Sequence, residues 1–175
     1  MSAISLFRVG LVLAALLTLG ACRDTGAEGE YFAINGRFVV FNYRVARATY
    51  LVTLKPLQPI AEGQTAVATM ENPAGGEAIV VREKIWPNLD KVTIESPPLH
   101  CIVKDRPYAV SIVIEGKDGK VLQKLDTTVT SSLDQTVLPD APLVVGPLYT
   151  PNPALAGRPG GDLPPDQVEA CPPAA

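Results

Sequence analysis

Between residues 31 and 145 the chain alternates apolar and polar side chains with a period of two, in short runs cut by glycine, proline, asparagine and aspartate. Such alternation predicts strands that bury one face, and no stretch has the 3.6-residue apolar stripe of an amphipathic helix. The predicted strands are 37–41, 44–54, 64–71, 78–85, 91–95, 108–115, 120–130 and 135–138. This pattern indicates a sandwich or a small barrel. We expect an all-β fold with a single antiparallel β-sandwich.

The clearest local prediction is a hairpin that joins the runs at 108–115 and 120–130. The turn between them contains Asp118 and Gly119, and Asp-Gly between two alternating runs is a strong hairpin signal. The run at 108–115 is apolar on both faces. We therefore expect this strand in the interior of its sheet.

The net charge argues against a nucleic-acid partner. The chain has 15 basic and 18 acidic side chains, and Arg8 is the only ionisable residue among the first 22, so the rest carries a net charge of −4. Phosphate binding requires a basic face. Acidic and basic residues are interspersed at 83–84, 104–106 and 117–120, which is typical of a solvated surface.

The first 22 residues have the features of an export leader. Residues 9–21 form an apolar run of 13 residues behind Arg8, too short for the roughly 20 residues that cross a bilayer. Residues 19–22 (LGAC) resemble the lipobox of bacterial lipoproteins. In that family the leader is cleaved before the cysteine, which carries acyl chains such as palmitate. The resemblance implies lipid attachment at Cys22, whereas an ordinary secretory cleavage site would leave Cys22 as a free thiol.

The residue after this cysteine bears on the choice of membrane. In the sorting rule of enteric bacteria, an aspartate there retains a lipoprotein in the inner membrane, and this chain has Arg23. We therefore expect a lipid anchor on the periplasmic face of the outer membrane. Residues 23–30 are polar and contain glycine, which predicts a flexible tether with a reach of roughly 16 Å.

The composition changes near the C-terminus, where 10 of the 17 prolines lie in the last 37 residues. This enrichment predicts an extended tail. The tail is either an irregular strap on the sandwich or a polyproline ligand for a partner, and we favour the strap. The predicted organisation is a leader at 1–21, an acylated cysteine and tether at 22–30, a sandwich at 31–145 and a Pro/Gly-rich tail at 146–175.

Two further cysteines, Cys101 and Cys171, remain in the exported chain. An exported protein with two thiols usually pairs them, and this bond would fasten the tail to the domain across 70 residues. Closing such a loop contributes roughly 4 kcal/mol in the chain-entropy model. The alternatives are an intermolecular disulfide or two free thiols.

Catalytic and metal-binding constellations are not evident in the sequence. His100 adjoins Cys101, but neighbouring residues of an extended chain project to opposite faces and cannot easily share an ion or form a base and nucleophile pair. No Gly-x-Ser-x-Gly motif, phosphate-binding glycine loop or Cys-x-x-Cys occurs. We interpret His100 as a surface residue beside a disulfide, and we expect no cofactor, no metal and no enzymatic activity.

Aromatic residues are concentrated at the start of the mature chain. Tyr31 and Phe32 precede the first predicted strand and are candidates for an exposed partner-binding patch beside the tether. The alternative is that all of these aromatics pack inside or against neighbours.

Residues 63–129 resemble the YbaY-like family of small bacterial envelope lipoproteins. The shared features are a strand at 65–69 (TAVAT), apolar runs at 79–81 and 92–94, a Tyr-Ala-Val opening at 108–110, and a glycine turn before a strand with Leu122 and Thr127. The resemblance implies an immunoglobulin-like or transthyretin-like sandwich and a binding or chaperoning role, without catalytic residues.

These observations predict a membrane-anchored periplasmic lipoprotein that acts as a protein-interaction or assembly accessory module. Its expected partners are the membrane, through the lipid, and another envelope protein. The alternative is an envelope hydrolase or a small-ligand carrier. A cleft with convergent carboxylates or His100 would favour the alternative, and an apolar edge or groove would favour the binding module.

Overall fold

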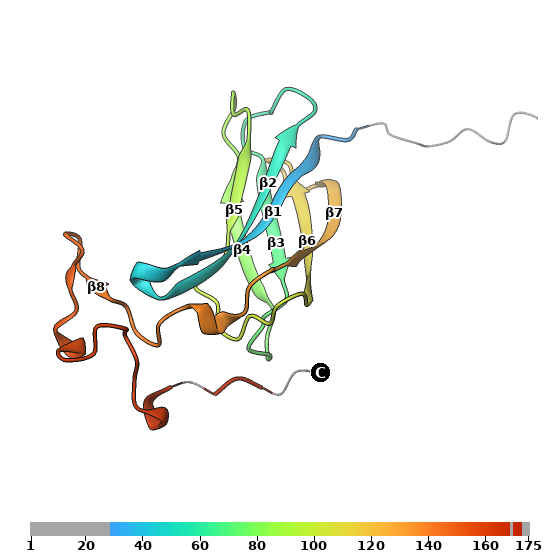
Figure 1. Cartoon of the computed structure of the whole chain (residues 1–175). Helices are drawn as coiled ribbons and strands as arrows, with labels where there is room; N and C mark the ends of the chain where they lie inside the picture. The colour runs from blue at the N-terminus through green and yellow to red at the C-terminus, as the bar shows by residue number, and fades with distance from the viewer. Residues whose placement is uncertain (1–28, 169, 173–175) are drawn as a thin grey trace, which may run out of the picture.

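The computed structural model describes residues 29–168 and 170–172, and its architecture is an antiparallel β-sandwich (Figure 1). The sandwich strands are β1 (Phe32–Asn42), β2 (Arg47–Pro56), β3 (Thr65–Met70), β4 (Ile79–Lys84), β5 (Val92–Glu95), β6 (Pro107–Glu115) and β7 (Val121–Thr130). One sheet has the order β1-β2-β5 and the other has the order β4-β3-β6-β7. The predicted all-β sandwich is confirmed, and β6 lies inside its sheet as expected.

This strand order is immunoglobulin-like, with three strands in one sheet and four in the other. A second immunoglobulin-like feature is the position of Tyr108 near the start of β6. Its hydroxyl accepts a hydrogen bond of 2.8 Å from the backbone N–H of Val103, five residues upstream. This is the arrangement called the tyrosine corner, which ties the incoming loop to the strand.

The core consists of the alternate residues of the facing strands. Ala48, Tyr50, Val52 and Leu54 of β2 are fully buried, as period-two alternation requires. The opposite sheet contributes Ala66, Ala68 and Met70 from β3 and Tyr108, Val110, Ile112 and Ile114 from β6. Because β2, β3 and β6 all lie inside their sheets, these three rows of side chains form the centre of the sandwich.

Two predicted strand boundaries are wrong at the N-terminal side. The first strand begins at Phe32 and not at residue 37, because Asn35 and Gly36, which resemble a turn in the sequence, form a β-bulge between Ile34 and Gly36. The second strand begins at Arg47, because Tyr43–Val45 forms a short 3₁₀ helix, η1, that turns the chain from β1 into β2.

The eighth predicted strand, at 135–138, is also wrong. Gln135–Val137 is a 3₁₀ helix, η2, whose first turn is capped by Asp134. The Asp134 carboxylate accepts a hydrogen bond of 3.2 Å from the Thr136 N–H. This local cap competes with the β-propensity of the threonine and valine that follow, and it directs the chain away from the sheet.

The tail contains two short strands, β8 (Val144–Val145) and β9 (Thr150–Pro151), which pair with each other and not with the sandwich. The predicted boundary at residue 145 passes through this small hairpin. Two further 3₁₀ helices follow, η3 (Pro153–Leu155) and η4 (Pro165–Gln167). Figure 1 shows the tail leaving the sandwich below the β1–β2 hairpin, extending to β8, and then running back below the sandwich.

A disulfide between Cys101 and Cys171 joins the returning tail to the sandwich, which confirms the predicted intramolecular pairing. We call the tail from residue 139 to its last described residue the strap. The bond closes a covalent loop between Cys101 and Cys171, which are 70 residues apart, and the strap is part of this loop.

The two ends of β1 lie far apart. The chain enters the sandwich at Phe32, and the β1–β2 hairpin extends beyond the body of the sandwich on the other side, toward β8 (Figure 1). An 11-residue strand is roughly 33 Å long. The predicted leader, tether and acylation site, including Cys22, lie outside the described residues. Within those residues, no helix has the length and hydropathy that crossing a bilayer requires.

Candidate functional site

The predicted patch at Tyr31 and Phe32 is not an exposed surface. Phe32 is the first residue of β1 and is only 1% exposed, and Tyr31 packs against the core. Phe32 does not precede the first strand, because β1 starts five residues earlier than the alternation indicates, whereas Tyr31 directly precedes it. The alternative prediction, that all of the N-terminal aromatics pack inside or against neighbours, holds for Tyr31 and Phe32 but not for Phe38 and Tyr43, which are exposed.

The first residues of β1 have a lateral partner on β7. The side-chain amide oxygen of Gln123 accepts hydrogen bonds of 2.9 Å from the N–H groups of Tyr31 and Phe32. Its amide nitrogen donates to the Phe32 carbonyl at 2.8 Å. Farther along β1, Arg37 donates to the Thr127 hydroxyl at 2.7 Å. One glutamine therefore replaces a neighbouring strand and covers this part of the β1 edge.

Beyond Arg37 the β1–β2 hairpin exposes apolar side chains. Phe38 is 55% exposed, and Val40 and Tyr43 are also exposed. The register pairs Phe38 with Leu51 and Val40 with Thr49, so these residues occupy the outer face of the three-stranded sheet, opposite to the face that carries Tyr50. In this region β1 has apolar residues on both faces, and it extends beyond the body of the sandwich.

The ring of Phe38 rests on the sheet and does not project freely into solvent. A Cβ at Gly36 would lie 2.8 Å from Cε2 of Phe38 and 2.8 Å from the Thr53 hydroxyl. Any side chain at position 36 would therefore displace the Phe38 ring or the Thr53 hydroxyl, and the glycine leaves room for the aromatic ring next to it on the strand.

The tail brings a second set of exposed apolar residues to the same place. The Leu143 N–H donates a hydrogen bond of 2.9 Å to the carbonyl of Arg44, and the Arg44 guanidinium lies 5.2 Å from the centre of the Tyr149 ring. Leu148 is 84% exposed, and Tyr149 and Val145 are exposed beside it. We call the following residues the tip patch: Phe38, Val40, Tyr43, Val145, Leu148 and Tyr149.

The segments that form the tip patch are basic. Residues 31–61 contain Arg37, Arg44, Arg47 and Lys55 and no acidic residue, although the whole chain has a net charge of −3. Residues 141–161 likewise contain Arg158 and no acidic residue. This surface was not predicted from the sequence. The available signal was the 31-residue run without aspartate or glutamate, which the interspersed charges elsewhere obscured.

A cavity of about 580 Å³ lies between the strap and the sandwich. His100, the disulfide and the carboxylates of Asp134, Asp140 and Asp162 line it. Two of the carboxylates have structural contacts. Asp134 accepts from the backbone N–H groups of Thr136 and, at 3.4 Å, of Lys104, and Asp140 accepts from the Leu163 N–H at 2.9 Å. No cluster of three or more metal-ligating side chains was found in the described part of the chain.

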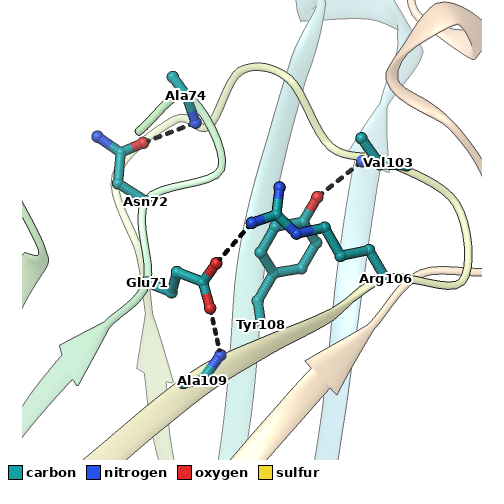
Figure 2. Close-up of polar contacts among 7 residues, drawn as sticks. All are labelled: Glu71, Asn72, Ala74, Val103, Arg106, Tyr108 and Ala109. Atoms are coloured by element: carbon teal, nitrogen blue, oxygen red, sulfur yellow. Dashed lines mark hydrogen bonds and ion pairs between the residues drawn. The ribbon is translucent and has the colours of Figure 1, made fainter. Parts of the chain in front are cut away.

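A polar cluster at the end of β3 also serves the fold (Figure 2). Glu71 accepts a hydrogen bond from the Arg106 guanidinium at 3.0 Å and another from the Ala109 N–H at 3.0 Å. The Arg106 guanidinium lies 5.1 Å from the centre of the Tyr108 ring. Glu71 and Arg106 therefore pair with each other and hold the loop that precedes β6.

Tyr50 lies in the core next to this cluster, with its ring centre 5.7 Å from that of Tyr108. Its hydroxyl is buried and has no hydrogen-bond partner among the described residues. Burial raises the pKa of Tyr50 far above its usual value, and Tyr108 and Glu71 raise it further. Tyr50 therefore remains neutral and contributes to packing.

Comparisons with known proteins add little to this description. No family model matches the chain, and no curated protein is significantly similar to it. Among solved structures, the crystal structure of an endonuclease/exonuclease/phosphatase from Beutenbergia cavernae DSM 12333 is similar over 55% of this chain and 28% of that chain, with 16% identity and a TM-score of 0.32. The chain therefore spans less than a third of that protein, and a likeness this weak carries no argument about function.

Proposed function

We propose that this chain is a lipid-anchored periplasmic lipoprotein that acts as a protein-interaction or assembly accessory module, with the tip patch as its binding surface. The observation that carries the proposal is the tip patch itself: exposed aromatic and aliphatic side chains on two hairpins that are joined by the Arg44–Tyr149 contact. Exposed apolar side chains that gather on neighbouring segments mark interaction sites on soluble domains. Tyrosine and arginine are the residue types enriched at interface centres.

The position of the tip patch fits a domain that is anchored at its N-terminus. The tether enters the sandwich at Phe32, and the tip patch lies at the other end of β1, roughly 33 Å away. A lipid at Cys22 would hold the Phe32 end near the bilayer. The tip patch would then be available to a second envelope protein and would not be covered by the anchoring membrane.

Site-specific crosslinking in cells tests the binding role. A photo-crosslinking residue at Tyr43 or Leu148 should capture a protein that mass spectrometry identifies, and the double variant Phe38→Ser with Tyr149→Ser, carrying the same crosslinker, should lose that capture. The matched control is Val80→Ser with Val121→Ser, because these valines are similarly exposed but lie on β4 and β7. Equal capture by both double variants would refute the tip patch as the binding surface.

The anchor has its own test. Cys22→Ser should release the protein from membranes, because two or three acyl chains attach a protein far more firmly than a 13-residue apolar run. A palmitate analogue should label the wild type and not the variant. A variant that still sediments with membranes, combined with an unlabelled wild type, would refute the lipoprotein assignment.

A small-ligand carrier is the second candidate, and the cavity beneath the strap favours it. Its volume of about 580 Å³ is in the range of small-molecule sites. Reduction of the disulfide would free one wall of the cavity. A carrier predicts that a bound compound is recovered from purified oxidised protein and is lost on reduction, whereas the binding module predicts no such compound.

A further inference from the structure

We infer that the free edge of β1 binds an extended polypeptide segment that is apolar at its centre and acidic at both ends, by adding it as a fourth strand to the β1-β2-β5 sheet. This inference rests on the proposed binding function and names the chemistry of the partner. It depends on the direction of the backbone groups at Val39 and Phe41, on the side chains of residues 38–41, and on the charge of the hairpin.

The backbone direction follows from the contacts of β2. The Tyr50 carbonyl accepts a hydrogen bond of 3.0 Å from the Ser96 N–H, and the Tyr50 N–H donates to the Ser96 hydroxyl at 2.9 Å, so both groups point away from β1. Val39 is the register partner of Tyr50. In an antiparallel ladder, two paired residues either hydrogen-bond to each other through their backbone or both point their N–H and C=O groups away from each other. The N–H and C=O of Val39 therefore point to the free edge.

The same argument applies two residues farther along the strand. The Ala48 carbonyl accepts a hydrogen bond of 2.8 Å from the Leu99 N–H, on the side away from β1, and Ala48 is paired with Phe41. Because the direction of the backbone groups alternates along a strand, the N–H and C=O groups of Arg37, Val39 and Phe41 all point to the free edge. In the described part of the chain, β1 forms a ladder with β2 alone.

This edge lacks the features that usually protect an edge strand. Residues 38–41 are Phe-Val-Val-Phe, without proline, lysine or any other charge. Exposed apolar edges of this kind pair with other strands unless a bulge, a charge or a cover prevents it. The β1 bulge lies near Ile34, at the end that Gln123 already covers, and leaves residues 38–41 regular.

The charges define the ends of the bound segment. Arg37 lies at one end of the free edge, and Arg44 and Arg47 lie at the turn beyond the other end. Glu95 is the only acidic residue in the three strands of this sheet, and β2 separates β5 from the free edge. A segment with acidic residues at both ends and apolar residues between them therefore complements the edge.

The same features disfavour other occupants. A second copy paired edge to edge would bring two hairpins together that each carry Arg37, Arg44 and Arg47 and no acidic residue. Like charges at an interface oppose association. An acyl-chain environment could not hydrogen-bond the open N–H and C=O groups of Val39 and Phe41. A polypeptide strand satisfies both the backbone groups and the charges.

The probe is an acetylated and amidated nonapeptide with alternating valine and threonine at its centre and two aspartates at each end. Amide exchange measured by NMR on the mature chain should slow at Arg37, Val39 and Phe41 when the peptide is added. Phe38 and Val40 should change little, because their N–H groups already face β2. Exchange that slows equally at all five residues, or at none, would overturn the inference.

Two control peptides test charge and backbone separately. Replacing the aspartates by lysines should weaken binding about tenfold, as expected from a few exposed charge pairs. A central proline should abolish binding, because it removes a ladder donor. Binding of the lysine peptide as tight as that of the acidic peptide would overturn the charge assignment.

Variants of the protein complete the test. Arg37→Glu with Arg47→Glu should weaken binding of the acidic peptide about tenfold. The control Lys91→Glu with Lys120→Glu makes the same charge change at exposed sites away from the hairpin and should have no effect. Slow exchange at Val39 that depends on protein concentration without peptide would instead identify a second copy as the occupant. Binding to vesicles of anionic lipid that protects the same amides would identify a membrane.

The outcome is separable from that of the proposed function. If the tip patch captures a partner in cells but the acidic peptide leaves Val39 exchange unchanged, the inference fails and the binding function stands. If the peptide binds as described but no partner is captured at Tyr43 or Leu148, the proposed function fails and the edge specificity stands.

Discussion

The two halves of β1 have similar composition but different surroundings. Phe32 in the first half is buried, and the Gln123 amide covers the adjacent edge. Phe38 in the second half is 55% exposed on a free edge. Each half presents aromatic and aliphatic residues to the same neighbouring strand, β2. Phe32 lies on the core face of the sheet and Phe38 on its outer face, so the face decides which ring is buried, whereas the lateral neighbour decides which part of the backbone edge is covered.

The largest effect is expected in the covered half. Phe32→Ala should lower the free energy of unfolding by about 3–5 kcal/mol, because a fully buried ring is removed and a cavity remains. Urea unfolding followed by tryptophan fluorescence or circular dichroism would measure this. A loss below about 1 kcal/mol would mean that the two halves of β1 do not differ in burial.

The disulfide comes next, because it ties the strap, and with it β8 and β9, to the sandwich. Cys101→Ser with Cys171→Ser should lower the free energy of unfolding by about 2–4 kcal/mol. Limited proteolysis should cut the strap of the variant before the sandwich unfolds. If the strap resists protease as well as it does in the wild type, contacts such as Arg44 with Tyr149 hold it without the covalent bond.

Gln123→Ala tests the lateral cover directly. The substitution leaves the N–H groups of Tyr31 and Phe32 without their acceptor and should cost about 1–3 kcal/mol. Amide exchange should accelerate at these two residues and stay unchanged at Val39. The control is Lys124→Ala, on the neighbouring exposed position of β7. Similar losses in both variants would show that the glutamine does not replace a strand.

The smallest effect on stability is expected at Phe38. Phe38→Ala should change the free energy of unfolding by no more than about 0.5 kcal/mol, since exposed positions tolerate substitution. The same variant should weaken partner capture. A loss comparable to that of Phe32→Ala would place Phe38 in the core and would remove the basis for the tip patch.

Much of the sandwich could be predicted because burial on one face leaves a period of two in the sequence. The strands from β3 to β7 were located within one or two residues, and Asp118-Gly119 marked the β6–β7 hairpin. The errors arose where a local signal has two physical meanings. Asn35 and Gly36 can form a turn or a bulge, and Asp134 can end a strand or cap a 3₁₀ helix.

The candidate site was harder to predict, and the reason is physical. Tyr31 and Phe32 were expected at the surface because they appeared to precede the first strand, and Phe38 and Val40 lay within the predicted strand 37–41 without an expected role at the surface. Both interpretations followed from sequence position alone. Neither the bulge that moves the start of β1 nor the Gln123 side chain from 91 residues away is visible in a local pattern.

By itself, the sequence determined the all-β class and the alternation that builds the core, because both depend on residue type and on spacing along one strand. The count of cysteines favoured the pairing of Cys101 with Cys171, and the structure decided it against the alternatives. The tertiary structure decided which half of β1 is covered and where the strap brings Tyr149 to Arg44. Those outcomes depend on which segments meet across the sandwich. Long-range contacts of this kind, such as Gln123 with Phe32, leave no periodic trace in the chain, so only the folded structure can separate a core edge from a free one.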